Sequence, residues 1–516
     1  MSALLTSLNY QAWVLDVLIL LPVLGCIPVF LLPAERAKHV ALAVTVAEFV
    51  VSAGLWWSFE PGTPGMQMAV QHEWISSWGI TYHLAIDGIS LFLVLLTTLT
   101  MPLSVLGSYT YIKTFERPYY ALLLVLTSGM LGVFLAQDLF VFYVFWEIML
   151  IPMYFIIGVW GGERRLYAAL KFFIYTFIGS LLMLVAILVI YLYVGRATGA
   201  YSFDYQYLLR NIWVTGSTWA PWLFGAFFLA FAIKVPMFPL HTWLPDAHVE
   251  APTAGSVILA GVLLKMGTYG FLRFALPLFP QVALDPTVSL VIVTLSVIGI
   301  VYGALVAMVQ PDFKNLIAYS SVSHLGFVML GIWALTLQSI QGAILIMINH
   351  GISTGALFFL AGMLYERRHT RAIAAFGGLA RVIPAFAVIL TFVSLSSIGL
   401  PGTNGFVGEF LVLLGSFGTQ PIATVIATTG VIFAAAYLLW ALQRMLFNKL
   451  DKPENERIPD LSVRELVVLA PLIACIIWIG VYPAPILRRT EAAAQALVNQ
   501  VRTPREIPRV GGGPVR

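Results

Sequence analysis

Between Trp219 and Leu240 the chain reads WAPWLFGAFFLAFAIKVPMFPL. A stretch of about 20 mainly apolar residues can cross the ~30 Å hydrocarbon core of a membrane as a helix. This stretch has one charge, Lys234, followed closely by Pro236 and Pro239. Proline removes a backbone donor and clashes with the preceding turn, so the two prolines break the helix. We therefore predict a membrane span with a charge beside an interruption.

The composition of the whole chain agrees with a membrane protein. Of 516 residues, 60% are hydrophobic and 10% are charged, whereas a soluble domain has roughly 25% charged residues. Apolar windows of spanning length lie near 13–33, 38–58, 84–108, 119–136, 139–159, 167–195, 219–240, 252–277, 286–309, 314–335, 338–365, 383–415, 421–447 and 464–486. We predict an all-α polytopic membrane protein with about fourteen transmembrane helices. A nucleic-acid partner is excluded, because no basic cluster is interleaved with aromatic residues.

Basic residues orient the spans, because cytoplasmic loops collect Lys and Arg. If the N-terminus lies outside, the inner connections carry Arg36, Lys38, Lys113, Arg117, Arg164, Arg165, Lys171, Lys314, Arg367, Arg368, Arg371, Arg381, Arg444, Lys449, Lys452, Arg457 and Arg464. The outer connections carry only Arg196, Arg210 and Arg273 before the tail. This asymmetry predicts two periplasmic termini. The tail departs from the rule, since it holds Arg488, Arg489, Arg502, Arg505, Arg509 and Arg516.

A second interruption is predicted in the long apolar segment 383–415. There the chain reads GLPGTNG from Gly399 to Gly405, which favours a loop over a helix. Interrupted helices at corresponding places in two halves are typical of inverted-repeat transporters with ion sites at mid-membrane depth. The alternative is a pair of ordinary proline kinks.

Four ionisable residues lie inside apolar spans: Glu147, Lys234, Lys265 and Glu409. A central Lys or Asp costs about 2.5 to 3.5 kcal/mol on insertion scales, and Glu is expected to be comparable. Glu147 and Lys234, on different helices, can share this cost as an ion pair in which each controls the proton affinity of the other. The alternative is a purely structural pair. Lys265 has small neighbours and apolar surroundings, which suit a lysine that loads and unloads a proton.

Two histidines extend this series of residues. His324 has Ser320 one helical turn before it, and His350 has Thr354 one turn after it. Each forms a short polar stripe that can hold an ordered water. The alternative is a satisfied core histidine without a role in transport. Two such stripes beside buried Lys and Glu favour a relay for protons.

Motifs for cofactors and metals are missing from the sequence. It has no phosphate-binding loop, no dinucleotide fingerprint and no haem or cluster motif. His241, Asp246, His248 and Glu250 crowd one connection, but their spacing matches no standard zinc pattern. We interpret this connection as a loop that caps the next helix and guards a proton entrance. We expect no cofactor in this chain, so another gradient or a partner subunit must drive transport.

Several motifs together resemble one family. HTWLPDAH from His241 to His248, APTAGS from Ala251 to Ser256 and LLKMG around Lys265 resemble the antiporter-like subunits of respiratory complex I. The same likeness extends to Phe145-Trp-Glu147, YSSVSHLG from Tyr319 to Gly326, Gly399 to Gly402, and Gly408-Glu409-Phe410. The chain is most similar to the M-type members, the counterparts of mitochondrial subunit four. Glu409 favours this type, because L-type members have a lysine there and a long C-terminal lateral helix, which we do not expect after Pro483.

The resemblance implies an inverted repeat of two five-helix units with two broken helices, and proton translocation coupled to quinone reduction elsewhere in an NADH-quinone oxidoreductase. It implies that Glu147 and Lys234 are a coupled pair and Lys265 the central relay. His324 and His350 would connect Lys265 to Glu409 near the periplasmic exit. It also implies quinone, FMN and iron–sulfur clusters in partner subunits, L-like and N-like membrane partners, surrounding lipids, and a bacterial inner membrane.

We expect N-terminal transmembrane helices over residues 1–118, a first repeat over 119–277 and a second over 286–447. Residues 448–516 should hold the last transmembrane helix and a polar C-terminal tail. Two rival functions stay open at this point: a subunit of the related multisubunit sodium/proton antiporters, and a membrane subunit of a related hydrogenase or photosynthetic complex. The redox subunits that co-purify with the chain would distinguish them.

Overall fold

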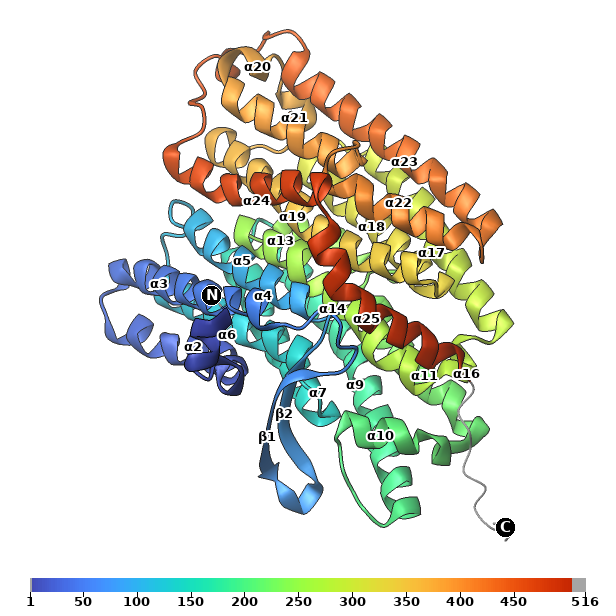
Figure 1. Ribbon diagram of the computed structural model, residues 1–516. Coiled ribbons are helices and arrows are strands. Elements are labelled where there is room, and N and C mark those ends of the chain that lie inside the picture. The colour runs from blue at the N-terminus through green and yellow to red at the C-terminus, as the bar shows by residue number, and fades with distance from the viewer. Residues whose placement is uncertain (1, 504–516) are drawn as a thin grey trace.

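A computed structural model describes residues 2–503 and consists mainly of helices that pack side by side (Figure 1). The N-terminal part contains α1 (Ser2–Ser7), η1 (Tyr10–Ala12), α2 (Val14–Leu31), α3 (Ala34–Ala53), α4 (Leu55–Ser58) and α5 (Leu91–Gly107). A hairpin of β1 (Gln67–Ile75) and β2 (Ile80–Ile86), with η2 (Ser76–Trp78) at its tip, precedes α5 and projects from the bundle. This hairpin is a departure from the all-α expectation.

Polar contacts attach the hairpin to the connection between α9 and α10 and to the start of α7. His83 Nδ1 lies 2.8 Å from Asp204 Oδ2, and the Thr81 N–H donates to Asp138. Burial alone would raise the pKa of Asp204, but the His83 hydrogen bond and the Tyr207 N–H outweigh it and lower that pKa. Asp138 also caps α7 by accepting the N–H groups of Phe140 and Val141, directly before the apolar window 139–159.

Five successive spans follow, and the fourth of them is interrupted. They are α6 (Glu116–Leu135), α7 (Leu139–Ile148) with α8 (Leu150–Trp160), α9 (Arg165–Thr198), α11 (Gly216–Lys234) with α12 (Trp243–Glu250), and a last helix made of α13 (Thr253–Ile258), η4 (Leu259–Leu263), α14 (Leu264–Gly270), η5 (Phe271–Ala275) and α15 (Leu276–Leu278). The short elements α10 (Tyr205–Asn211), η3 (Ile212–Thr215) and α16 (Pro280–Ala283) lie in the connections.

A second run of five spans repeats this order, again with the fourth interrupted. It consists of α17 (Pro286–Met308), α18 (Phe313–Ala334), α19 (Leu337–Arg368), α21 (Pro384–Ile398) with α22 (Asn404–Phe417), and α23 (Pro421–Leu442) with η7 (Gln443–Phe447). The connections hold η6 (Ile373–Ala375), α20 (Leu379–Val382) and η8 (Pro453–Asn455), and α24 (Val463–Val481) and α25 (Ala484–Arg502) end the described chain. Both predicted interruptions are therefore present.

The two interruptions follow from local sequence. The first lies between Lys234 and Trp243, where the prolines prevent the helix from continuing. The second contains Gly399 at φ 86° and Gly402 at φ 90°, a backbone region that residues with a Cβ rarely adopt.

Within residues 2–503, eleven helices are long and apolar enough to span a membrane. Four shorter apolar helices are Leu91–Gly107, Thr218–Lys234, Pro384–Ile398 and Asn404–Phe417. If the last two are the halves of one interrupted span, these helices bring the number of crossings to fourteen. The fold class is thus that of a polytopic helical membrane protein, and the count of fourteen stays a prediction.

The helices differ strongly in burial. The spans that contain Lys265, His324 and His350 are 100%, 94% and 100% buried over their most apolar windows, whereas the α9 window is 39% buried. The helices that carry these three side chains therefore form the centre of the bundle, and α9 lies at its edge.

The segment expected as a polar tail is helical as far as Arg502. In α25 the residues Ile486, Thr490, Leu497 and Val501 are buried, so one face of this helix packs on the bundle. Gln341 Nε2 donates to the Leu487 carbonyl, and α25 crosses the bundle in front of α14 and α11 (Figure 1). After Pro483 the expected polar tail is thus corrected to a helix of 19 residues, which is not the long lateral helix expected of L-type members. Residues 504–516 of the predicted tail lie outside the described residues.

Candidate functional site

The six predicted site residues come from six helices. Glu147 is on α7, Lys234 ends α11, Lys265 is on α14, His324 is on α18, His350 is on α19 and Glu409 is on α22. Three elements belong to the first run of five spans and three to the second. The structure brings four of these residues together in two direct contacts, and it leaves the other two apart.

Lys265 and His350 form the centre of the site. Lys265 is fully buried, and its Nζ lies 2.6 Å from His350 Nδ1. The same Nζ also donates to the Ala260 carbonyl, which lies in the π-helical segment η4. A π-helical turn inside an α-helix leaves its carbonyls free for other donors and is frequent at functional sites. The lysine is therefore held without a carboxylate partner.

Two glycines set the positions of these helices. A Cβ on Gly267 would lie 2.8 Å from the Phe231 carbonyl oxygen, so α14 and α11 approach through this glycine. A Cβ on Gly351 would lie 2.8 Å from the Gly261 carbonyl oxygen, where α19 meets η4. Larger residues at either position would push apart the helices that carry Lys234, Lys265 and His350.

His324 and Glu409 form the second contact. His324 Nδ1 lies 3.2 Å from Glu409 Oε1, and its Nε2 lies 3.4 Å from Ser397 Oγ. The ring centroids of His324 and His350 are 5.8 Å apart. Between them lies a cavity of about 20 Å³, which is lined by both histidines and Glu409 and is sufficient for about one water molecule. A single water can therefore connect the two contacts.

Polar side chains also fasten the second interruption to α19. Ser353 Oγ lies 2.9 Å from Ser396 Oγ and 3.1 Å from Asn404 Oδ1, and Asn349 Nδ2 donates to the Asn404 carbonyl. Asn404 begins α22, the helix that carries Glu409. This network fixes Glu409 relative to His350 on α19.

Glu147 and Lys234 do not form the expected ion pair in this structure. Lys234 Nζ donates to Met149 Sδ at 3.4 Å and lies over the rings of Trp146 and Phe172. Tyr143 and Ser180 face the Glu147 carboxyl, and Glu147 Oε1 has no hydrogen-bond partner among the described residues. The two charges still interact through space. The pair is thus open, with aromatic and sulfur contacts where a carboxylate was expected.

Two buried residues that the sequence placed in connections belong to the same interior. His248 lies on α12, is fully buried and stacks on Phe358 with ring centroids 4.6 Å apart. Lys314 was assigned to a cytoplasmic loop, but it is 7% exposed and donates to the Ala251 carbonyl. A count of charges between apolar windows cannot detect this burial. Ala247 and Ala251 are buried as well, but Asp246 and Glu250 on the same helix as His248 are only half-buried, so the local sequence contains no clear signal of this interior.

Arg273, expected in an outer connection, is also buried. Its Nη2 lies 2.6 Å from Asp87 Oδ2, and the Tyr205 hydroxyl donates to the Arg273 carbonyl. Asp87 in turn accepts the N–H groups of Ile89 and Ser90 at the start of α5. This ion pair joins the end of the Lys265 helix to α5.

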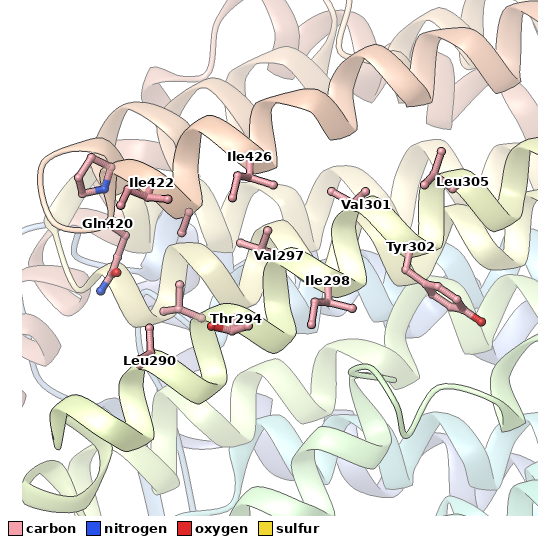
Figure 2. A pocket seen from close by; sticks show the side chains of 13 residues that line it. Leu290, Thr294, Val297, Ile298, Val301, Tyr302, Leu305, Gln420, Ile422 and Ile426 are labelled. Atoms are coloured by element: carbon pink, nitrogen blue, oxygen red, sulfur yellow. The ribbon is translucent and has the colours of Figure 1, made fainter.

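The outer face carries a groove of about 670 Å³ between α17 and the start of α23 (Figure 2). Its 13 lining residues include Val297, Ile298 and Ile426 but no carboxylate, lysine or histidine. This chemistry excludes the groove from proton transfer. Among residues 2–503, no group of three or more His, Cys, Asp or Glu side chains could hold a metal ion.

Comparisons with known proteins find close relatives over almost the whole chain. A family model described as "NADH:quinone oxidoreductase/Mrp antiporter, TM" matches residues 136–434. NADH-quinone oxidoreductase subunit M of Rhodobacter capsulatus is 49% identical over 455 residues, which cover 87% of this chain and 88% of the relative. NADH-ubiquinone oxidoreductase chain 4 of Marchantia polymorpha is 42% identical over 93% of this chain and 96% of its own.

The fold agrees with a solved structure as well. A chain of respiratory complex I from Thermus thermophilus with bound NADH superposes with a TM-score of 0.85 at 32% identity. The superposition covers 94% of this chain and 99% of that chain.

Proposed function

The chain belongs to the NADH:quinone oxidoreductase/Mrp antiporter family, and we propose that it is the M-type, proton-translocating membrane subunit of a complex I-type NADH-quinone oxidoreductase. The observation that carries this proposal is the line of contacts from Lys265 through His350 and His324 to Glu409. Buried ionisable groups inside a membrane bundle are functional by default, because each one is costly to insert.

Each contact of the line joins two groups that can exchange a proton. The Lys265 ammonium can release a proton to His350 Nδ1, which lies at hydrogen-bond distance. A water in the cavity between the histidines can carry the proton from His350 to His324. His324 Nδ1 faces Glu409 Oε1, which accepts the proton next. The line therefore provides a route from the centre of the bundle to the second interruption.

The open Glu147–Lys234 pair provides the control of this route. A change in the separation of two buried charges changes the proton affinity of both, because the surrounding protein screens them less than water does. Charge movement linked to quinone reduction in a neighbouring subunit would close or open the pair. A closed pair retains the proton on Lys234, and an open pair allows its release toward Lys265.

The assembly around the chain follows from this function. Quinone, FMN and iron–sulfur clusters are then carried by partner subunits, and L-like and N-like antiporter subunits are its membrane neighbours. We place the chain in the bacterial inner membrane with both termini periplasmic, in accord with the basic residues of the inner connections. We assign residues 119–277 and 286–447 to the two functional repeats.

The test is proton translocation by the intact purified assembly in vesicles with Glu147→Ala or Lys234→Ala. Both variants should assemble, lose proton pumping and show depressed coupled quinone reductase activity. Glu48→Gln is the matched control, because Glu48 on α3 is fully buried but lies outside the line, and it should pump as the wild type does. Near-wild-type pumping by both alanine variants would contradict the assignment.

Sodium dependence distinguishes the rival antiporter function, which the family description also covers. The same wild-type vesicles are assayed with and without added sodium. The proposal predicts equal proton translocation in both conditions. Pumping that requires sodium would instead favour the sodium/proton antiporter.

A further inference from the structure

The end of α12 nearest the basic inner connections is held by donors from four other parts of the chain. The Gly162 N–H donates to the Glu250 carbonyl, and Ser256 Oγ donates to the His248 carbonyl. Lys314 and Arg371 both donate to the Val249 carbonyl. The last carbonyls of this short helix, which a helix leaves without partners of its own, are thus bonded.

Lys314 makes the closest of its contacts beyond the helix end. Its Nζ lies 2.6 Å from the Ala251 carbonyl oxygen and 3.4 Å from that of Val249. An ammonium has three hydrogens to donate, so one is left for water. The charged groups that act on Lys314 are Arg371, Asp312 and Glu250.

His248 directly precedes Val249, whose carbonyl Lys314 contacts, and its ring stacks on Phe358 of α19, the helix that carries His350. The charges of both Lys314 and Lys265 act on its ring. The ring is fully buried, and neither nitrogen has a hydrogen-bond partner among the described residues. Buried polar atoms without a protein partner are normally satisfied by ordered water. Both imidazole nitrogens are therefore left to exchange hydrogen bonds and protons with water.

We propose that Lys314 takes up protons from the cytoplasmic side and passes them through His248 to Lys265. This inference rests on the proposed function. The neutral Lys314 amine takes a proton from water and becomes an ammonium. It returns to the amine when the proton moves, through water, to a His248 nitrogen. The imidazolium then becomes neutral as Lys265 receives the proton.

Holding α12 in place does not by itself require a lysine at position 314. Arg371 already donates to the Val249 carbonyl, and its Nε pairs with Asp312 Oδ2 at 3.1 Å. Arginine offers more donors than lysine in a fixed geometry and stays charged in proteins. A residue that only caps the helix could be lysine or arginine, whereas a residue that accepts and releases protons cannot be arginine.

The experiment compares Lys314→Arg with Lys314→Met in the intact purified assembly in vesicles. Lys314→Arg keeps a cation on the same carbonyls but cannot release its proton. We expect both variants to lower proton pumping at least about five-fold relative to the wild type, in line with the ~10²–10⁴-fold typical of a positioned acid–base group. Arg371→Lys is the matched control and should pump normally. Wild-type pumping by Lys314→Arg would overturn the proposal and reduce Lys314 to a helix cap.

A second variant keeps the inference testable if the arginine is too large to assemble. Histidine at position 314 is smaller and exchanges protons near neutral pH. Lys314→His should pump at least three-fold faster than Lys314→Met, and equal rates would overturn the proposal. If Glu147→Ala stops pumping while Lys314→Arg does not, only this inference fails. If Glu147→Ala and Lys234→Ala both pump normally, the proposed function fails first.

Discussion

The two interrupted helices have similar places in their runs of five spans but different surroundings. At the first interruption, Lys234 contacts Met149 Sδ and two aromatic rings, and no carboxylate of residues 2–503 lies within 4.0 Å of it. At the second, Glu409 contacts His324, and hydroxyl and amide groups join the broken helix to α19. The first interruption thus holds its charge apart from carboxylates, whereas the second connects its charge to polar side chains.

This difference indicates that the first interruption controls proton transfer and that the second conducts the proton. A charge with few polar partners responds strongly to a neighbouring charge, because little in its surroundings compensates the field. A charge within a polar network passes its proton on with little rearrangement. The first interruption therefore suits the step that senses the driving reaction, and the second suits the route to the exit.

Among the three variants that test this comparison, Glu409→Gln should have the largest effect, because it breaks the second half of the comparison. Glutamine keeps the size and can hydrogen-bond to His324, but it cannot exchange a proton. We expect about ten-fold slower pumping, which corresponds to a loss of ~1.4 kcal/mol in the limiting step. Proton uptake by vesicles that contain the assembled complex measures it. A pumping rate within two-fold of the wild type would remove Glu409 from the route.

Gly267→Ala tests whether close packing sets the distance between Lys234 and Lys265. The new Cβ would meet the Phe231 carbonyl oxygen at 2.8 Å and the Val235 nitrogen at 2.9 Å, so we expect a loss of about 1–3 kcal/mol in stability. The thermal midpoint of the purified assembly should fall. Gly261→Ala is the control, because its Cβ would have no neighbour closer than 3.8 Å. Equal midpoints for both variants would contradict the packing argument.

Met149→Leu should have the smallest effect and sharpens the account of the first half. Leucine has a similar volume without sulfur, and such exchanges usually cost less than ~1.5 kcal/mol. If the Met149 sulfur only positions Lys234 and takes no part in proton transfer, the pumping rate should stay within about two-fold of the wild type. A loss as large as that of Glu409→Gln would show that the sulfur contact is part of the transfer.

The sequence predicted the features that depend on local composition. Apolar windows located the spans, and prolines and glycines located both interruptions. The six ionisable residues were recognisable because few other residues in their windows are charged; the exceptions are Arg273 in the Lys265 window and Lys314 in the His324 window. Their roles stay predictions, although the structure joins Lys265 to His350 and His324 to Glu409.

Features that depend on contacts between distant segments were missed. Lys314 and Arg273 were counted as loop charges, because sequence cannot reveal that Ala251 and Asp87 lie against them. The open state of the Glu147–Lys234 pair depends on how α7 packs beside α11. The helix α25 had a detectable signal, since its buried residues recur at helical spacing, but its many charged and polar residues suggested a tail.

The central claim is that Lys265 joins the two halves into one route. The most direct test is the number of protons translocated per NADH oxidised by the intact assembly in vesicles, with Lys265→Met compared with the wild type. Methionine fills the site but cannot carry a proton, so the account predicts that translocation falls at least about ten-fold. A Lys265→Met assembly that translocates protons at the wild-type ratio would contradict it.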